Sequence, residues 1–85
     1  MYRVEILPAA ARSLAKLDGS VQRRCARVIN RLAEDPHGPG SARLRGADDI
    51  WRVRVGDYRI LYQVLADRLV VLVVAIGQRA TVYRR

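Results

Sequence analysis

The sequence predicts a small α+β domain in which two helices pack on one face of an antiparallel sheet, in the order β-α-α-β-β-β. Apolar residues recur at helical spacing in the first half of the chain and follow strand-like patterns from Ile50 onward. Helical and extended segments in separate blocks are typical of this fold class. A chain of 85 residues has room for one hydrophobic core, so we expect a single domain over residues 1–85.

The first half of the chain is expected to form one strand and two helices. Residues 2–6 alternate apolar and charged side chains, which is typical of a half-buried strand. Pro8 is tolerated at the first position of a helix, and Gly19 marks its end. A second helix, capped by Ser20, should end near Asp35, because the proline that follows disfavours the helical conformation. Its apolar face consists of Val21, Cys25, Val28, Ile29 and Leu32.

The segment from residue 50 to residue 65 is expected to form a β-hairpin. Its centre is Gly56-Asp57, and glycine at the first central position favours a type II′ turn. A two-residue turn fixes the register of the two strands, so Arg54 should stand opposite Arg59. The same register places six residues on the face toward the helices: Trp51, Val53, Val55, Tyr58, Ile60 and Tyr62.

A last strand is expected over the apolar run of residues 69–76, with Gly77 breaking it. If the turn before it lies at residues 66–68, its end near Ala75 and Ile76 lies beside Arg59. Residues 36–46 are rich in glycine and proline and are expected to form a loop.

The chain is strongly basic. Lys and Arg number 16 against 8 Asp and Glu, which gives a formal net charge of +8, and Lys16 is the only lysine. Since 51% of the residues are hydrophobic, the chain can fold, and its charge indicates a polyanionic partner. Nucleic acid, an anionic membrane and an acidic protein all stay open on charge alone. One helix stripe could contact a nucleic acid or be a solvated face: Arg23, Arg27 and Arg31, with Arg24 adjacent.

We expect a cluster of arginines on the sheet face that points away from the helices. Arg54 and Arg59 in opposing positions repel each other unless an anion neutralises them. Arg52 shares this face, and Arg79 should emerge at the same edge, with Tyr83 a few residues further on. Because guanidinium groups bind phosphate bidentately, the cluster predicts a phosphate site. The alternative is a set of ordinary solvated strand arginines.

Other kinds of site have little support. Cys25 is the only cysteine, so no intrachain disulfide is possible, and its core spacing favours a buried thiol over a nucleophile. His37 is a lone loop histidine, and one His with one Cys makes no zinc site, so we expect neither metal nor cofactor. No apolar run reaches the roughly 18 residues of a membrane span. We therefore expect a soluble, cytoplasmic protein without a membrane partner.

Several segments resemble the RelE/ParE superfamily of bacterial toxins. They are Leu44-Arg45-Gly46, residues 51–62 with the sequence Gly-Asp-Tyr-Arg-Ile-Leu-Tyr at their end, and the C-terminal Gly-Gln-Arg-Ala-Thr-Val-Tyr-Arg at residues 77–84. The resemblance extends over nearly the whole chain, and its C-terminal part is closer to the RelE branch than to the ParE branch.

The resemblance implies a metal-independent endoribonuclease that cuts mRNA in the ribosomal A site and so inhibits translation. The 2′-hydroxyl attacks the adjacent phosphate, leaving a 2′,3′-cyclic phosphate and a 5′-hydroxyl. By matching position, Arg59 would stabilise the transition state and Arg79 would assist the leaving 5′-oxygen. Tyr83 would act as base or orient the 2′-hydroxyl. The RNA backbone would be held by Arg45, Arg52 and Arg54.

Some members of the superfamily carry lysine where this chain has Arg52 and Arg54. Arginine cannot lose its proton in proteins, so neither residue can act as a base, and that role shifts to Tyr83 or water. A tyrosine, with a reference pKa near 10, needs nearby cations to favour its ionised form. The arginine cluster would supply them.

The resemblance also implies a cognate antitoxin whose acidic or amphipathic segment would cover this basic domain in a toxin–antitoxin hetero-oligomer. Two other functions stay open. One is ParE-like inhibition of DNA gyrase without RNA cleavage, and the other is a catalytically inactive nucleic-acid-binding or interaction module. The C-terminal segment favours the ribonuclease, because Arg79 and Tyr83 together are what RNA cleavage would need.

Overall fold

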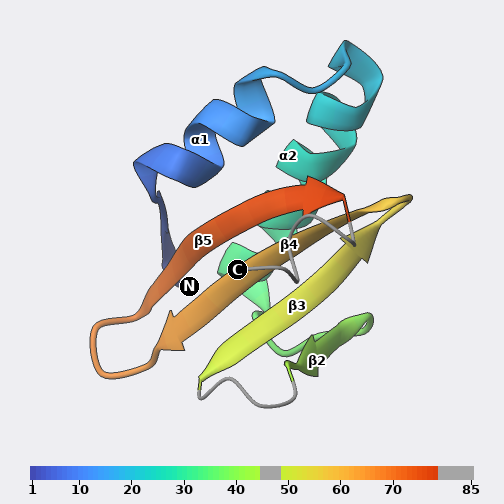
Figure 1. The fold of residues 1–85 in the computed structure, drawn as a ribbon. Helices are drawn as coiled ribbons and strands as arrows, with labels where there is room; N and C mark the ends of the chain where they lie inside the picture. The colour runs from blue at the N-terminus through green and yellow to red at the C-terminus, as the bar shows by residue number, and fades with distance from the viewer. Residues whose placement is uncertain (45–48, 79–85) are drawn as a thin grey trace.

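A five-stranded sheet is covered on one face by two helices in the computed structural model, which describes residues 1–44 and 49–78 (Figure 1). The strands are β1 (Arg3–Ile6), β2 (Ser41–Arg43), β3 (Ile50–Val55), β4 (Tyr58–Leu65) and β5 (Val70–Gln78). The helices are α1 (Pro8–Ala15) and α2 (Gly19–Glu34). The order of strands in the sheet is β1-β5-β4-β3-β2.

The α+β class and the helix pair on one sheet face are confirmed, and two details of the sheet differ from the prediction. β1 pairs in parallel with β5, so the sheet is mixed rather than antiparallel. The short strand β2 forms within the segment expected to be a loop and pairs antiparallel with β3. A strand of three residues among glycines and prolines is too short to show an alternating pattern, which is why the sequence did not indicate it.

Each helix begins at a residue suited to that position. α1 begins at Pro8. Proline lacks an amide hydrogen, and in the first turn of a helix that hydrogen would have no partner within the helix. The cap of α2 is Asp18 rather than the predicted Ser20. The Asp18 carboxylate accepts hydrogen bonds from the Ser20 backbone N–H at 3.2 Å and from the Ser20 hydroxyl at 2.7 Å. These bonds favour the charged form and lower the Asp18 pKa.

The hairpin between β3 and β4 has the predicted register. Val55 pairs with Tyr58, Val53 with Ile60 and Trp51 with Tyr62. Gly56 has a φ of 60°, in the left-handed region that a type II′ turn requires at this position. The buried core between this sheet face and the helices consists of Ala10, Cys25, Ile29, Leu32, Val53, Val55, Ile60, Tyr62, Val71, Val73 and Ile76.

Strand β5 contains a bulge that shifts its pairing with β4 by one residue. Val74 has no partner on β4, and beyond it Arg59 pairs with Gly77 instead of lying beside Ile76 as predicted. The extra residue allows Val73 and Ile76, three positions apart, to reach the same core. β5 therefore runs through Gly77, where the sequence predicted that it would break.

Tyr62 joins the sheet to the chain that leaves α2. Its side chain is fully buried in β4, and its hydroxyl donates a hydrogen bond of 2.6 Å to the Pro36 carbonyl. Burial raises the pKa of this phenol, because the ionised form would lose its hydration. The contact fixes the C-terminal end of α2 against the sheet, and so helps to set the position of the helix beside β3.

We predict that Tyr62→Phe lowers the free energy of unfolding by about 1 kcal/mol, because the Pro36 carbonyl loses its hydrogen bond. The raised pKa means that the folded state favours the neutral phenol. Wild-type stability should therefore fall as the pH rises above about 10, where the unfolded tyrosine ionises. The substitution should reduce that fall.

Urea unfolding at a series of alkaline pH values measures both effects, with Tyr58→Phe as the matched control at a half-buried tyrosine of the same strand. An equal alkaline loss of stability in the wild type and the Tyr62→Phe variant would contradict the prediction.

Candidate phosphate-binding site

Three arginines of the hairpin lie on the sheet face that points away from the helices. Arg54 pairs directly with Arg59, and Arg52 pairs with Leu61 one step along the same face. Because side chains alternate between the two faces of a strand, Arg52 and Arg54 point opposite to the core residue Val53. The structure thus brings together three of the predicted site residues.

The three arginines differ in exposure. Arg54 is exposed, Arg52 is half-buried, and Arg59 retains only 7% of its surface. A buried guanidinium is confined by its surroundings, so its N–H donors are already oriented before a ligand arrives. An exposed arginine such as Arg54 is free to adjust to the ligand. The site therefore combines one fixed donor group with adaptable ones, an arrangement suited to a phosphate group.

The remaining predicted site residues, Arg45, Arg79 and Tyr83, lie outside the described residues. The described part of β5 ends at Gln78, which pairs with Tyr58 at the hairpin end of the sheet.

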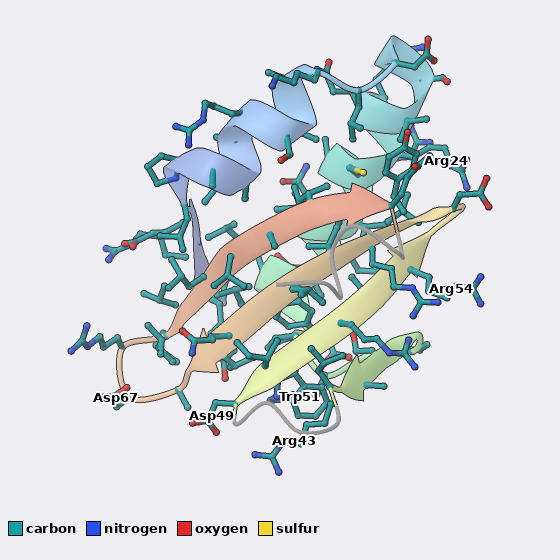
Figure 2. All side chains as sticks on the ribbon, viewed as in Figure 1. Arg24, Arg43, Asp49, Trp51, Arg54 and Asp67 are labelled. Carbon is teal, nitrogen blue, oxygen red and sulfur yellow. The ribbon has the colours of Figure 1, made fainter. Side chains whose placement is uncertain are left out.

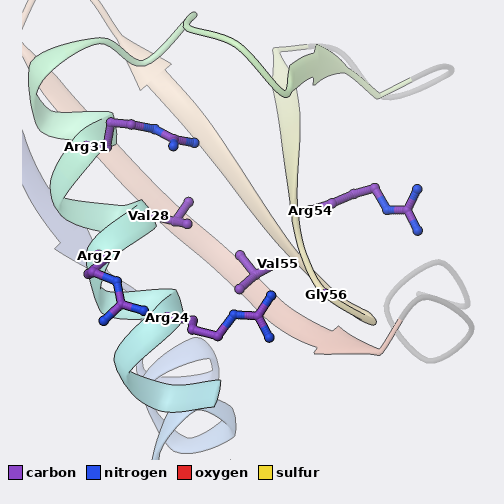
Figure 3. A pocket seen from close by; sticks show the side chains of 7 residues that line it. All are labelled: Arg24, Arg27, Val28, Arg31, Arg54, Val55 and Gly56. Carbon is purple, nitrogen blue, oxygen red and sulfur yellow. The ribbon is translucent and has the colours of Figure 1, made fainter. Parts of the chain in front are cut away.

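A second basic surface adjoins the first. A groove of about 440 Å³ lies between α2 and the edge of β3 (Figure 3). It is lined by Arg24, Arg27, Val28, Arg31, Arg54, Val55 and Gly56. The sequence predicts Arg23 on the same helix stripe as Arg27 and Arg31, but Arg23 lines a different surface, between α1 and α2. Arg24 takes its place in the groove, and Figure 2 shows Arg24 and Arg54 at the same end of the molecule, near the hairpin turn.

The other residues singled out in the sequence are structural. Cys25 is fully buried, and burial raises the pKa of its thiol, which disfavours a nucleophilic thiolate. The ring of His37 lies 4.6 Å from that of the half-buried Trp51 at an angle of 57°. Within residues 1–44 and 49–78, the His, Cys, Asp and Glu side chains form no cluster able to hold a metal ion. No helix in this part of the chain has the length and hydrophobicity of a membrane span.

Proteins of known family resemble this chain. Residues 4–83 match the family model of the ParE toxin of the type II toxin–antitoxin system parDE. A RelE-like toxin protein of Escherichia coli is 35% identical over 80 residues, which cover 92% of this chain and 83% of that protein. The mRNA interferase toxin RelE of E. coli K12 is 26% identical, with the same coverage. The toxin-like chain in the intact E. coli RelBE toxin–antitoxin complex has a TM-score of 0.82 at 25% identity, covering 92% of this chain and 96% of that one.

We predict that Arg54→Glu raises the free energy of unfolding by about 0.5 kcal/mol, because it replaces a like-charge pair across the two strands with an opposite-charge pair. The same substitution should weaken the binding of inorganic phosphate, since one of the guanidinium groups is lost. Urea unfolding and a phosphate titration followed by NMR measure the two effects.

The control is Arg68→Glu, which makes the same change of charge at an exposed arginine outside the paired strands β3 and β4. Equal stabilisation by the two variants would show that net charge, and not the pairing with Arg59, is responsible.

Proposed function

The chain belongs to the ParE toxin family of type II toxin–antitoxin systems, within the RelE/ParE superfamily, and we propose that it is a ribosome-dependent mRNA endonuclease that inhibits translation. The observation that carries the proposal is the set of three arginines on one sheet face, with Arg59 buried and directly opposite Arg54. The family relationship and the similarity to a protein named mRNA interferase support it.

The chemistry of RNA cleavage suits such a site. The ribose 2′-oxygen forms a bond to the adjacent phosphorus while the bond from phosphorus to the 5′-oxygen breaks, which gives a 2′,3′-cyclic phosphate and a 5′-hydroxyl. Negative charge builds on the phosphate oxygens during this step. Donors that are already oriented stabilise that charge without rearranging, and Arg59 fills this role. Arg52 and Arg54 hold the neighbouring phosphates.

The proton transfers fall to residues outside the arginine set. The 2′-hydroxyl gives its proton to the ionised form of Tyr83 or to water, because an arginine in a protein does not lose its own proton and cannot accept another. The departing 5′-oxygen takes a proton from solvent, while Arg79 donates a hydrogen bond to it. No metal ion takes part. These roles complete the proposal for residues whose placement the structure does not describe.

An antitoxin is the proposed protein partner. The similarity to the toxin chain of the RelBE complex supports a partner of this kind. With a net charge of +8, the chain should attract an acidic or amphipathic segment, which would neutralise the sheet-face arginines while it covers them.

A second candidate function is inhibition of DNA gyrase without RNA cleavage. The match of residues 4–83 to the ParE family model favours it. The names of the sequence relatives and the phosphate-directed arginines favour the ribonuclease. The two functions differ in whether oriented guanidinium groups are needed for toxicity, so they can be separated by substitution.

We predict that Arg59→Lys and Arg79→Ala each slow mRNA cleavage by at least about 100-fold, which is the usual effect of losing one oriented donor to a developing negative charge. Lysine keeps the charge at position 59 but not the bidentate geometry. Mapping of mRNA 5′ ends on translating ribosomes, after expression without antitoxin, measures cleavage. Urea unfolding verifies that each variant is folded.

Arg68→Lys is the matched control and should cleave like the wild type. Intact message accompanied by gyrase-dependent DNA breaks would replace the proposal with gyrase inhibition. If the wild type neither cleaves mRNA nor affects growth, the chain is an inactive member of its family.

A further inference from the structure

We propose that the groove between α2 and the edge of β3 binds a second stretch of RNA backbone, next to the sheet-face site but distinct from it. The inference rests on the proposed function for the identity of the polyanion as RNA. It concerns residues that the proposed chemistry does not use, namely Arg24, Arg27 and Arg31 of α2.

The α2 wall of the groove carries a row of guanidinium groups. Arg24, Arg27 and Arg31 are three and four residues apart, so they share one face of the helix and span about 10 Å along its axis. All three are exposed. In Figure 3, Arg24 and Arg31 extend from α2 toward β3. The row is long enough to contact more than one phosphate of a single strand.

The opposite wall is a stretch of sheet edge that no described strand covers. β2 pairs with β3 only as far as Val53, so the last two residues of β3, Arg54 and Val55, have no partner on that side among the described strands. Such an edge presents backbone N–H and C=O groups to whatever lies beside it. These groups can bond to ribose hydroxyls and phosphate oxygens, which adds neutral contacts to the charged ones of the helix.

Arg24 lies against the hairpin turn, where Gly56 has no side chain to keep it away. A Cβ atom at Gly56 would lie 3.4 Å from both terminal nitrogens of Arg24. The guanidinium therefore lies close to the turn backbone. This contact joins α2 to the hairpin and sets one end of the groove.

Charge favours a phosphate backbone as the occupant. The ion pairs in the described ranges join Arg3 with Glu5 and Arg43 with Asp49, so none engages an arginine of the groove. No carboxylate is among the residues that line it. Guanidinium forks match phosphate oxygens in geometry as well as in charge.

An acidic protein segment fits the groove less well. A segment that folds on binding needs apolar contacts to offset the entropy it loses, and this groove offers only Val28 and Val55. The surface between α1 and α2 is far more apolar, with Ala11, Leu14, Ala15 and Ala26 among its lining residues. A protein partner therefore has a better surface elsewhere on the chain.

Arg54 connects the groove to the sheet-face site. It lines the groove, and it also pairs with Arg59 on the sheet face. Its guanidinium extends away from α2 (Figure 3). An RNA strand that leaves Arg59 can thus pass the hairpin edge beside Arg54 and enter the groove.

The test is the salt dependence of RNA binding by the double variant Arg27→Gln/Arg31→Gln. Each phosphate contact to a single strand contributes about 0.7 to the slope of log affinity against log salt, so losing two should lower the slope by about 1.4. Affinity near physiological salt should fall about tenfold. The probe is a fluorescent RNA oligonucleotide with 2′-O-methyl riboses, which cannot be cleaved by attack of the 2′-hydroxyl.

The matched control is Arg12→Gln/Arg68→Gln, which removes the same charge from exposed arginines outside both sites and should leave the slope nearly unchanged. An equal slope change in the two double variants would overturn the proposal. So would a groove variant that loses affinity for poly-glutamate but keeps its RNA slope, because the groove would then bind an acidic protein.

Failure of the proposed function has a different signature. One outcome is that the wild type cleaves no mRNA, while the salt slope of RNA binding falls in the groove variant and not in the control variant. The groove then binds a phosphate backbone, and the ribonuclease assignment is wrong. If the wild type cleaves mRNA and the slopes do not differ, the groove inference alone is wrong.

Discussion

The two-residue turn at Gly56-Asp57 determines which side chains of the hairpin enter the core and which form the candidate site. With Gly56 at a φ of 60°, the turn allows a single register between β3 and β4. That register sends Val53 and Ile60 into the core and Arg54 and Arg59 to the opposite face. A shift by one residue would exchange the two sets, because side chains alternate along a strand. The same local geometry therefore produces both the hydrophobic core and the candidate site.

Along each strand of the hairpin, apolar side chains point to the core and arginines point to the opposite face. As a result, Arg54 and Arg59 stand opposite each other on neighbouring strands. Arg54 and Arg59 repel each other in the folded state, and Arg59 is also removed from water. A phosphate bound beside the two groups would reduce the repulsion between them. The like-charge pair is therefore one physical reason for this face to favour a polyanion.

The features that the sequence predicted well are those set by neighbours in the chain. The hairpin register and the end of α2 before a proline are local consequences of turn and helix chemistry. The parallel pairing of β1 with β5 and the bulge at Val74 depend on contacts between distant segments, and no local pattern indicates them. The groove depends on how α2 packs against β3, so the sequence named both Arg23 and Arg24 but could not indicate that only Arg24 lines the groove. The roles of all six predicted site residues stay predictions: Arg45, Arg52, Arg54, Arg59, Arg79 and Tyr83.

In the proposed reaction, oriented guanidinium groups stabilise a phosphate under attack by the neighbouring 2′-hydroxyl. The most direct test is a ribosome-bound message with one 2′-deoxynucleotide placed 5′ to the cleaved bond. We predict that cleavage at that bond is lost, while the unmodified message gives a 2′,3′-cyclic phosphate and a 5′-hydroxyl in mass spectrometry. Continued cleavage of the deoxy-substituted bond, with a 5′-phosphate on the product, would show that water is the nucleophile and that the 2′-hydroxyl is not.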